Sequence, residues 1–179
     1  QVRAQRIAYE NGLPAFDITR EGDVLCRVKL LVPGEHNVRN ALAAAAAALM
    51  LGLSADSIER GLSSYTGAER RFDSRGQYNG AVVYDDYAHH PSELHALFDA
   101  AEQMKAEGGR LICAFQPHTY TRTKAFFEDF VRELSRPDLT VLADIYAARE
   151  KNTVGAADSR CGLSARTGRY HRLFALGRP

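Results

Sequence analysis

The chain has 179 residues, of which 45% are hydrophobic, so it is long enough to form one domain with a buried core or two small ones. Its 23 basic and 22 acidic side chains give a formal net charge of +1, which provides no general attraction to nucleic acid or to a membrane surface. No apolar run is long enough to span a membrane, and the three widely spaced cysteines indicate neither a disulfide framework nor a zinc site, so we expect a cytoplasmic protein.

The first third of the chain is expected to contain strands followed by two helices. Alternating and apolar segments predict β structure over residues 7–32, with a turn at Asn11-Gly12. The alanine-rich sequence that follows favours a helix over residues 37–51, because alanine has the highest helix propensity. Ser54 is a suitable N-cap for a second helix over residues 55–62.

A domain boundary is expected near Gly67, which separates residues 1–67 from residues 68–179. Beyond a polar stretch, strands and helices are predicted to alternate, over residues 81–84, 91–106, 111–115, 123–134 and 139–143. This alternation indicates an α/β fold with a parallel sheet and crossover helices. After Gly155 the pattern is lost, and we expect an atypical or truncated end in which only residues 173–176 form a strand.

The start of the alanine-rich helix carries three polar side chains, His36, Asn37 and Asn40. Asn37 and Asn40 are three residues apart and therefore lie on one face of the first helical turn. Their amides can recognise the donor and acceptor edge of a base. The alternative is that His36 or Asn37 caps the helix, which leaves Asn40 unexplained.

A basic pair, Arg70-Arg71, precedes Phe72 in the predicted segment between domains. A guanidinium group beside a hinge can reach a phosphate or a carboxylate. The alternative is a pair of solvated surface charges.

Titratable side chains are concentrated directly after the strand over residues 81–84, from Asp85 to His90. Polar groups at this point are typical of a ligand site at the carboxyl edge of an α/β sheet. A carboxylate such as that of Asp86 can accept both ribose hydroxyls or bind Mg²⁺, whereas a histidine such as His89 can contact a carboxylate. The alternative is a polar loop that ends in an Asx-type helix cap.

A second polar segment, residues 115–123, again follows a strand and precedes a helix. We expect it to lie on the same sheet edge as the preceding segment, with Arg122 as the partner of a small carboxylate. The structural alternatives are a buried aromatic ring, a turn and a helix cap, at Phe115, Pro117 and Thr121 or Thr123.

Three well-known catalytic motifs are absent from the sequence. It contains no G-x-x-x-x-G-K-[ST] phosphate loop, no G-x-G-x-x-G dinucleotide motif and no G-x-S-x-G nucleophile turn. If the protein uses ATP, the loop that surrounds its phosphates is therefore not in this sequence.

Taken together, these motifs resemble the Mur ligases of peptidoglycan synthesis, in particular the members that add L-alanine. The resemblance extends from about Tyr9 to Gly155 and rests on five strings, G-E-H-N-V-R-N-A-L-A-A, G-A-E-R-R-F-D, D-D-Y-A-H-H-P-S-E, F-Q-P-H-T-Y-T-R-T and D-I-Y-A-A-R-E. It implies that residues 1–67 end a central ATPase domain, with a β-hairpin and helices, and that residues 68–179 form a Rossmann-like C-terminal domain. It also implies ATP-dependent formation of an amide between UDP-N-acetylmuramate and L-alanine through an acyl phosphate.

The resemblance assigns roles to individual residues. On the nucleotide side these are His36, Asn37 and Asn40 at the adenine, Arg71 as an essential residue near the phosphates, and Asp86 with Tyr87 at the ribose. On the amino-acid side these are His89, His118 and Arg122, of which Arg122 holds the carboxylate and His89 has a catalytic role. Many members carry arginine where this chain has Thr119.

The resemblance further implies ATP and Mg²⁺ as cofactors, with the phosphate loop, a carbamylated lysine and the main Mg²⁺ ligands upstream of this sequence. The isolated chain is then expected to catalyse nothing. A second hypothesis is a stand-alone Rossmann-like module that binds a nucleotide or an amino acid without catalysis. A third, binding of a polyanion by the basic residues after Gly155, predicts an affinity that falls steeply with salt, but we expect neither a nucleic-acid nor a membrane partner.

Overall fold

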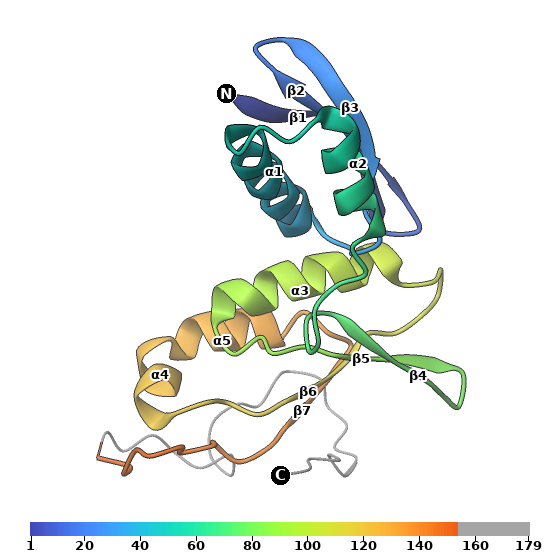
Figure 1. Cartoon of the computed structure of the whole chain (residues 1–179). Helices are drawn as coiled ribbons and strands as arrows, with labels where there is room; N and C mark the ends of the chain where they lie inside the picture. Colours follow the sequence, from blue (N-terminus) through green and yellow to red (C-terminus); the bar gives the residue numbers. More distant parts are fainter. Residues whose placement is uncertain (154–179) are drawn as a thin grey trace. The chain divides into compact units, whose positions relative to one another are not determined.

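A computed structural model describes residues 1–153 of the chain (Figure 1). These residues divide into two compact units, the first comprising residues 1–87 and 99–104 and the second comprising residues 88–98 and those from Lys105 onward. The domain boundary near Gly67 stays a prediction. The predicted strand over residues 173–176 and the basic residues after Gly155 lie outside the described residues.

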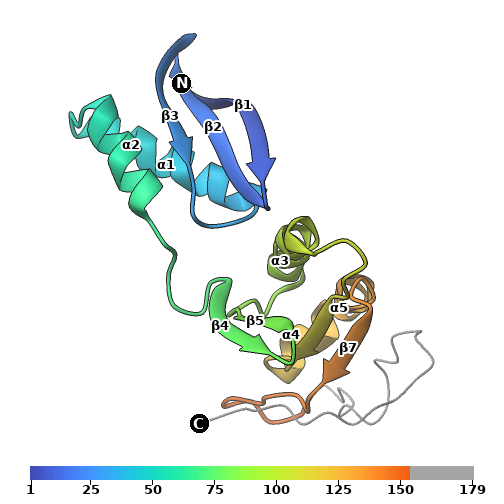
Figure 2. The same cartoon turned by 90° about the vertical axis from the view of Figure 1, so that its right-hand side faces the viewer.

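The first unit begins with a three-stranded antiparallel sheet in the order β1-β2-β3, which is followed by two helices. The elements are β1 (Val2–Glu10), β2 (Leu13–Arg20), β3 (Asp23–Lys29), α1 (Glu35–Met50) and α2 (Ala55–Ser64). Both helices cover one face of this sheet, as Figures 1 and 2 show. The prediction of β structure followed by two helices is confirmed, although the first strand starts at Val2, before the expected residue 7.

The core of this part of the chain consists of apolar side chains from β2, β3 and the two helices. Phe16, Ile18 and Val28 are fully buried, and Ala45 of α1 packs into the same cluster. Ser54 caps α2 as predicted, because its side chain accepts a hydrogen bond from the Ser57 backbone N–H at 3.3 Å.

The polar stretch before residue 81 was expected to be a linker without secondary structure, and this prediction is wrong, because it contains a strand. Strand β4 (Asp73–Tyr78) pairs antiparallel with β5 (Ala81–Asp85). The turn residues between them, Asn79 and Gly80, have φ values of 49° and 81°, as a tight two-residue hairpin turn requires. Because β4 is polar and mostly exposed, it lacks the apolar alternation by which a strand is recognised in sequence. Strand β5 therefore has an antiparallel partner and not the predicted parallel one.

The second unit contains a parallel pair of strands with helices between them in the chain. It includes the first part of α3 (Pro91–Met104), followed by β6 (Ile112–Phe115), α4 (Tyr120–Ala125), α5 (Phe127–Leu134) and β7 (Leu139–Leu142). Strand β6 is parallel to β7, so the predicted parallel sheet with a helical crossover is confirmed for this pair. The described fold is thus mixed α/β with a small parallel sheet.

Helices α3 and α5 pack against β6 through a compact apolar core. Leu94, Phe98, Phe115, Phe130 and Leu134 are each less than 8% exposed. Cys113 packs against this core, and burial raises the pKa of its thiol to about 12, which disfavours the thiolate at neutral pH.

The single helix predicted over residues 123–134 is in fact two helices, which meet at Phe126. Phe126 has φ −114° and ψ 26°, outside the helical range, and its ring lies 4.6 Å from that of His90. Phe130 is buried, but Phe126 and Phe127 are 36% and 37% exposed. Of these three phenylalanines, only Phe130 therefore belongs to the core.

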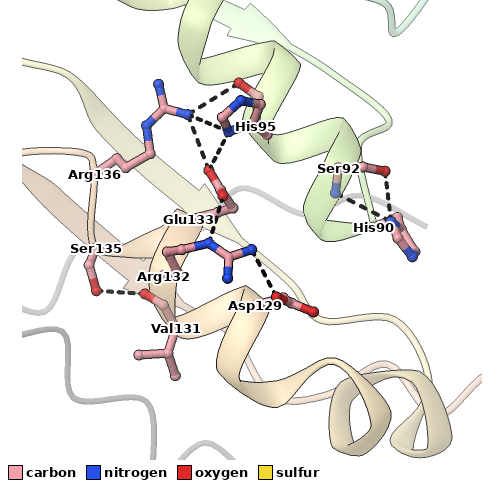
Figure 3. A network of polar contacts seen from close by, with 9 residues as sticks. All are labelled: His90, Ser92, His95, Asp129, Val131, Arg132, Glu133, Ser135 and Arg136. Atoms are coloured by element: carbon pink, nitrogen blue, oxygen red, sulfur yellow. Dashed lines mark hydrogen bonds and ion pairs between the residues drawn. The ribbon is translucent and has the colours of Figure 1, made fainter.

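A buried carboxylate on α5 joins α5 to α3 (Figure 3). Glu133 is 4% exposed and accepts hydrogen bonds from His95 Nδ1 at 3.1 Å, from Arg136 at 3.1 Å and from Arg132 at 3.3 Å. Burial by itself raises the pKa of this carboxyl, but the hydrogen bonds from Arg136, His95 and Arg132 outweigh burial, and the pKa is lowered.

None of the helices within residues 1–153 is long and apolar enough to cross a membrane.

Candidate functional site

The predicted residues at the start of α1 lie on one face of its first turn. The Asn37 amide donates to the Pro33 carbonyl at 2.8 Å, and the Asn40 amide donates to Asn37 Oδ1 at 3.1 Å. The N-cap is Gly34, with φ 92°, and no side chain caps the helix. The alternative explanation of His36 or Asn37 as the capping residue is therefore wrong.

His36 is half-buried, and its titration connects it to two other predicted residues of the first unit. Burial is the main cause that lowers the pKa of the His36 imidazole below its ordinary 6.5. The carboxylate of Asp86 opposes this lowering, and the guanidinium groups of Arg39 and Arg71 add to it. His36, Arg71 and Asp86 are thus close enough to influence one another electrostatically.

The basic pair and the acidic motif after β5 are joined by backbone hydrogen bonds. The Asp86 carboxylate accepts from the Phe72 backbone N–H at 2.8 Å, and the Tyr87 N–H donates to the Arg70 carbonyl at 2.8 Å. Arg70 and Phe72 have φ values of 57° and 50°, in the left-handed region that such residues rarely adopt. The two predicted motifs are therefore joined by hydrogen bonds in one turn that carries Asp86 and Arg71.

The side chains of this turn present cations beside an aromatic ring. The guanidinium of Arg70 lies 4.8 Å from the centre of the Tyr87 ring, and that of Arg71 lies 5.9 Å from it. Asp85 pairs with Arg75 at 3.2 Å and with Arg70 at 3.8 Å. Arg71 is exposed to solvent, so its charge is available to an anion.

The two histidines that follow have different local roles. His90 is the N-cap of α3, and its ring accepts from the Ser92 N–H at 3.3 Å (Figure 3). Glu93 completes a capping box by accepting from the His90 N–H at 3.1 Å and the His89 N–H at 2.8 Å. The Glu93 carboxylate also lies 3.5 Å from His89 Nδ1, which fixes the orientation of the His89 ring. A histidine thus takes the place of the Asx-type cap.

The predicted amino-acid residues converge in the second unit. The His89 and His118 rings are 5.8 Å apart, and Arg122 donates to His118 Nδ1 at 3.4 Å. Tyr146 adds a ring 5.4 Å from that of His118, and its backbone forms a parallel bridge with that residue. His89, His118, Arg122 and Tyr146, which we call the histidine cluster, come from three segments that are far apart in the sequence.

The convergence was expected, but the strands that produce it are different. We expected both segments on one edge of a single parallel sheet, whereas β5 pairs with β4 and the hydrogen-bonded neighbour of β6 is β7. The segment after β7 therefore contacts the segment after β6, through Thr119 N–H to the Tyr146 carbonyl at 2.9 Å and Tyr146 N–H to the Pro117 carbonyl at 2.8 Å.

Three residues of the site had no role assigned from sequence. Glu93 could have been found, because a carboxylate three residues after a helix cap is the spacing of a capping box. Tyr146 and Glu150 belong to the string D-I-Y-A-A-R-E, but their partners lie 28 and 29 residues earlier in the chain. That pairing requires knowledge of the strand order.

The two groups of predicted residues differ in the chemistry that their side chains offer. The exposed Arg71, the Asn40 amide and the Asp86 carboxylate offer a cation, a base-edge amide and a hydroxyl acceptor. The histidine cluster offers a guanidinium held against an imidazole, which is suited to a small carboxylate. Within residues 1–153, no three His, Cys, Asp or Glu side chains are grouped so that they could hold a metal ion.

The described residues form a mixed α/β fold in which one unit carries the residues predicted for a nucleotide and the other carries those predicted for a small carboxylate. Residues 70–171 match the family described as Mur ligase, glutamate ligase domain. The chain belongs to this Mur ligase family.

The relatives indicate the branch of the family. The chain is 49% identical over 152 residues to the UDP-N-acetylmuramate–L-alanine ligase of Clostridium novyi, which covers 85% of this chain and 33% of that protein. It is 51% identical over 152 residues to the protein of the same name from Agathobacter rectalis, which covers 84% of this chain and 33% of that protein. The chain thus spans about one third of the length of the curated relatives it matches.

A solved structure of a protein with a similar name also resembles this chain. The crystal structure of the UDP-N-acetylmuramate–alanine ligase of Thermotoga maritima matches with a TM-score of 0.68 and 28% identity, over 80% of this chain and 32% of that one.

Proposed function

We propose that this chain is part of an ATP-dependent ligase that joins L-alanine to the carboxylate of UDP-N-acetylmuramate. The observation that carries the proposal is the convergence of His89, His118 and Arg122 in a chain 49% identical to a ligase of that name. We further propose that residues 1–67 end a central ATPase domain and that residues 68–179 belong to a Rossmann-like domain. A cytoplasmic location follows from this function, since ATP is supplied there.

The nucleotide is assigned to groups of the first unit. The Asp86 carboxylate, fixed by the Phe72 N–H at 2.8 Å, would accept from the ribose hydroxyls, with Tyr87 beside it. The exposed Arg71 would neutralise phosphate charge. His36, Asn37 and Asn40 would contact the adenine, and the Asn37–Asn40 hydrogen bond orients both amides for this task.

Mg²⁺ and the phosphate loop have no place in the described residues. Residues 1–153 offer no cluster of three metal-binding side chains, and the sequence has no phosphate loop. We therefore assign the Mg²⁺ ligands to parts of the ligase other than residues 1–153.

The histidine cluster is assigned to L-alanine. The Arg122 guanidinium would bind the amino-acid carboxylate, and its bond to His118 Nδ1 requires that nitrogen to be an acceptor, which leaves the proton on Nε2. His89, oriented by Glu93 at 3.5 Å, would contact the amine. Holding the carboxylate and the amine at two points directs the nitrogen lone pair at the acyl phosphate, from which phosphate leaves as the amide forms.

The test is a chimera in which this chain replaces the matching third of the Clostridium novyi relative. We expect ADP formation that requires both UDP-N-acetylmuramate and L-alanine, with an amide product detected by mass spectrometry, and no turnover with D-alanine. The 179-residue chain alone is expected to be inactive. A chimera without amino-acid-dependent turnover, together with binding of a nucleotide or of L-alanine by the 179-residue chain alone, would support the stand-alone binding module and overturn the proposal.

A further inference from the structure

Helix α4 follows directly on His118 and carries Arg122, yet it lacks a cap of its own. Its N-cap residue, Thr119, makes no side-chain cap hydrogen bond and has φ 67°, in the left-handed region. The first N–H groups of a helix have no partner within the helix, so they need an acceptor from elsewhere. A β-branched residue with this φ is also strained unless its surroundings hold it.

The acceptor comes from a residue 29 positions later in the chain. The Glu150 carboxylate accepts from the Thr121 backbone N–H at 3.0 Å and from the Thr121 hydroxyl. These two bonds are the main causes that lower the pKa of the Glu150 carboxyl, and the Thr119 hydroxyl and the Tyr120 N–H add to the lowering. A negative charge at this end of a helix is also favoured by the helix dipole.

The segment that contains Glu150 also forms hydrogen bonds with the backbone on both sides of His118. Tyr146 exchanges backbone hydrogen bonds with both neighbours of His118, at 2.9 Å with Thr119 and at 2.8 Å with Pro117. The segment from Tyr146 to Glu150 thus fixes the chain immediately before and immediately after Thr119. His118 and Arg122, whose side chains are hydrogen-bonded to each other at 3.4 Å, lie before and after Thr119 in the chain.

We propose that Glu150 is a positioning residue of the amino-acid pocket: it caps α4 from a distance and thereby holds Arg122 against His118 in the geometry that binds the substrate carboxylate. This inference rests on the proposed function, since it assigns the pocket to the amino acid. Glu150 itself contacts no substrate. Its removal therefore weakens amino-acid binding and leaves the chemical step nearly intact.

The capping contact is tested first, in the 179-residue chain and without any turnover. A backbone N–H that donates to a carboxylate has a downfield proton resonance, so Glu150→Ala should move the Thr121 amide proton upfield. Glu107→Ala, which removes an exposed carboxylate from a turn of the same unit, should leave that resonance in place. An unchanged Thr121 resonance in Glu150→Ala would overturn the cap. If that variant does not fold, Glu150→Gln should give a smaller upfield shift of the same resonance, because its amide keeps one uncharged acceptor oxygen.

The positioning role is tested in the chimera by separating KM from kcat. In Glu150→Ala we expect KM for L-alanine to rise on the order of tenfold, because small displacements of a binding group cost this much or more. We expect kcat and KM for ATP to change less than about twofold, which is the pattern of a lost ground-state contact. Glu150→Gln should fall between wild type and Glu150→Ala, and Glu107→Ala should match wild type.

The outcomes distinguish this inference from the proposed function. An upfield Thr121 shift with an unchanged KM for L-alanine would show that the cap is purely structural and overturn the positioning role. If the unsubstituted chimera shows no alanine-dependent turnover, the proposed function fails and the amino-acid role of Glu150 fails with it. The Thr121 resonance then still decides whether the cap exists.

Discussion

The starts of α1 and α4 both carry candidate binding residues, and they are held in place in different ways. At α1 the polar contacts are local. The Asn37 amide donates a hydrogen bond to the Pro33 carbonyl, four residues earlier, and the Asn40 amide donates one to Asn37, three residues earlier. At α4 the partners are distant, because Glu150 accepts from Thr121 across 29 residues. A local arrangement survives distant changes, whereas α4 depends on the correct placement of the segment after β7.

The largest expected effect comes from removing the binding group at α4. In the chimera, Arg122→Ala should lower kcat/KM for L-alanine by about 10- to 100-fold, because a hydrogen bond to a charged group contributes about 1.5–3 kcal/mol. The measurement is the L-alanine dependence of ADP formation. Arg110→Ala, at an exposed arginine of the same unit, is the matched control. An equal loss in both variants would mean that charge alone, and not the contact at α4, determines the affinity.

Next in size is the loss of the carboxylate that joins α5 to α3. Glu133→Gln should lower the free energy of unfolding by about 2–3 kcal/mol, because three hydrogen bonds from His95, Arg132 and Arg136 lose their charged acceptor. Denaturant unfolding measures the effect. Asp129→Asn, which removes the charge of a partly exposed partner of Arg132 at 2.8 Å, should cost less than about 1 kcal/mol.

The same carboxylate predicts how this stability depends on pH. The folded-state pKa of Glu133 is lowered from its ordinary 4.5, so its contribution is complete above pH 4.5 and is lost as the pH falls through the folded-state value. The Glu133→Gln variant should lack this part of the acid dependence. Parallel stability curves for the two proteins below pH 4.5 would contradict the assignment.

A smaller and purely local effect is expected at α1. The φ of Gly34 is 92°, and a Cβ at this position would lie 2.7 Å from Cε1 of the His36 ring. Gly34→Ala should therefore destabilise the chain by about 1–2 kcal/mol through backbone strain and should also displace the imidazole. Gly52→Ala, at the other end of α1, has a φ of 81° but nothing within 4 Å, so it should leave the His36 ring signals unchanged.

The contrast between the two helix starts also explains what the sequence could predict. The helices α1 and α2 and the Ser54 cap were predicted correctly, because alanine propensity and capping act over a few residues. Asn37 and Asn40 were placed on one face from their spacing alone.

Features that depend on strand pairing were predicted wrongly or not at all. Strand β4 was not predicted because it is polar and exposed. The parallel pairing predicted for β5 was wrong because β4, its antiparallel partner, had not been recognised as a strand. The contact between Thr121 and Glu150 requires the β6–β7 pairing, which brings the segments after both strands together. No local pattern contains that information.

Acid titration should distinguish the two helix starts without any change at either of them. The hydroxyl and the N–H of Thr121 lower the pKa of Glu150 below its ordinary 4.5, so the cap is intact at and above pH 4.5 and is lost as the pH falls through the lowered value. The Thr121 amide proton should then move upfield, and in Glu150→Gln this step should be missing.

At α1 no such step is expected from the hydrogen bond between the Asn40 and Asn37 amides, because it contains no ionisable group. His36, whose pKa burial lowers from 6.5, adds its own titration to the signals of α1, and His36→Gln removes it. A Thr121 step that persists in Glu150→Gln would assign the titration to another group and would make α4 as locally determined as α1.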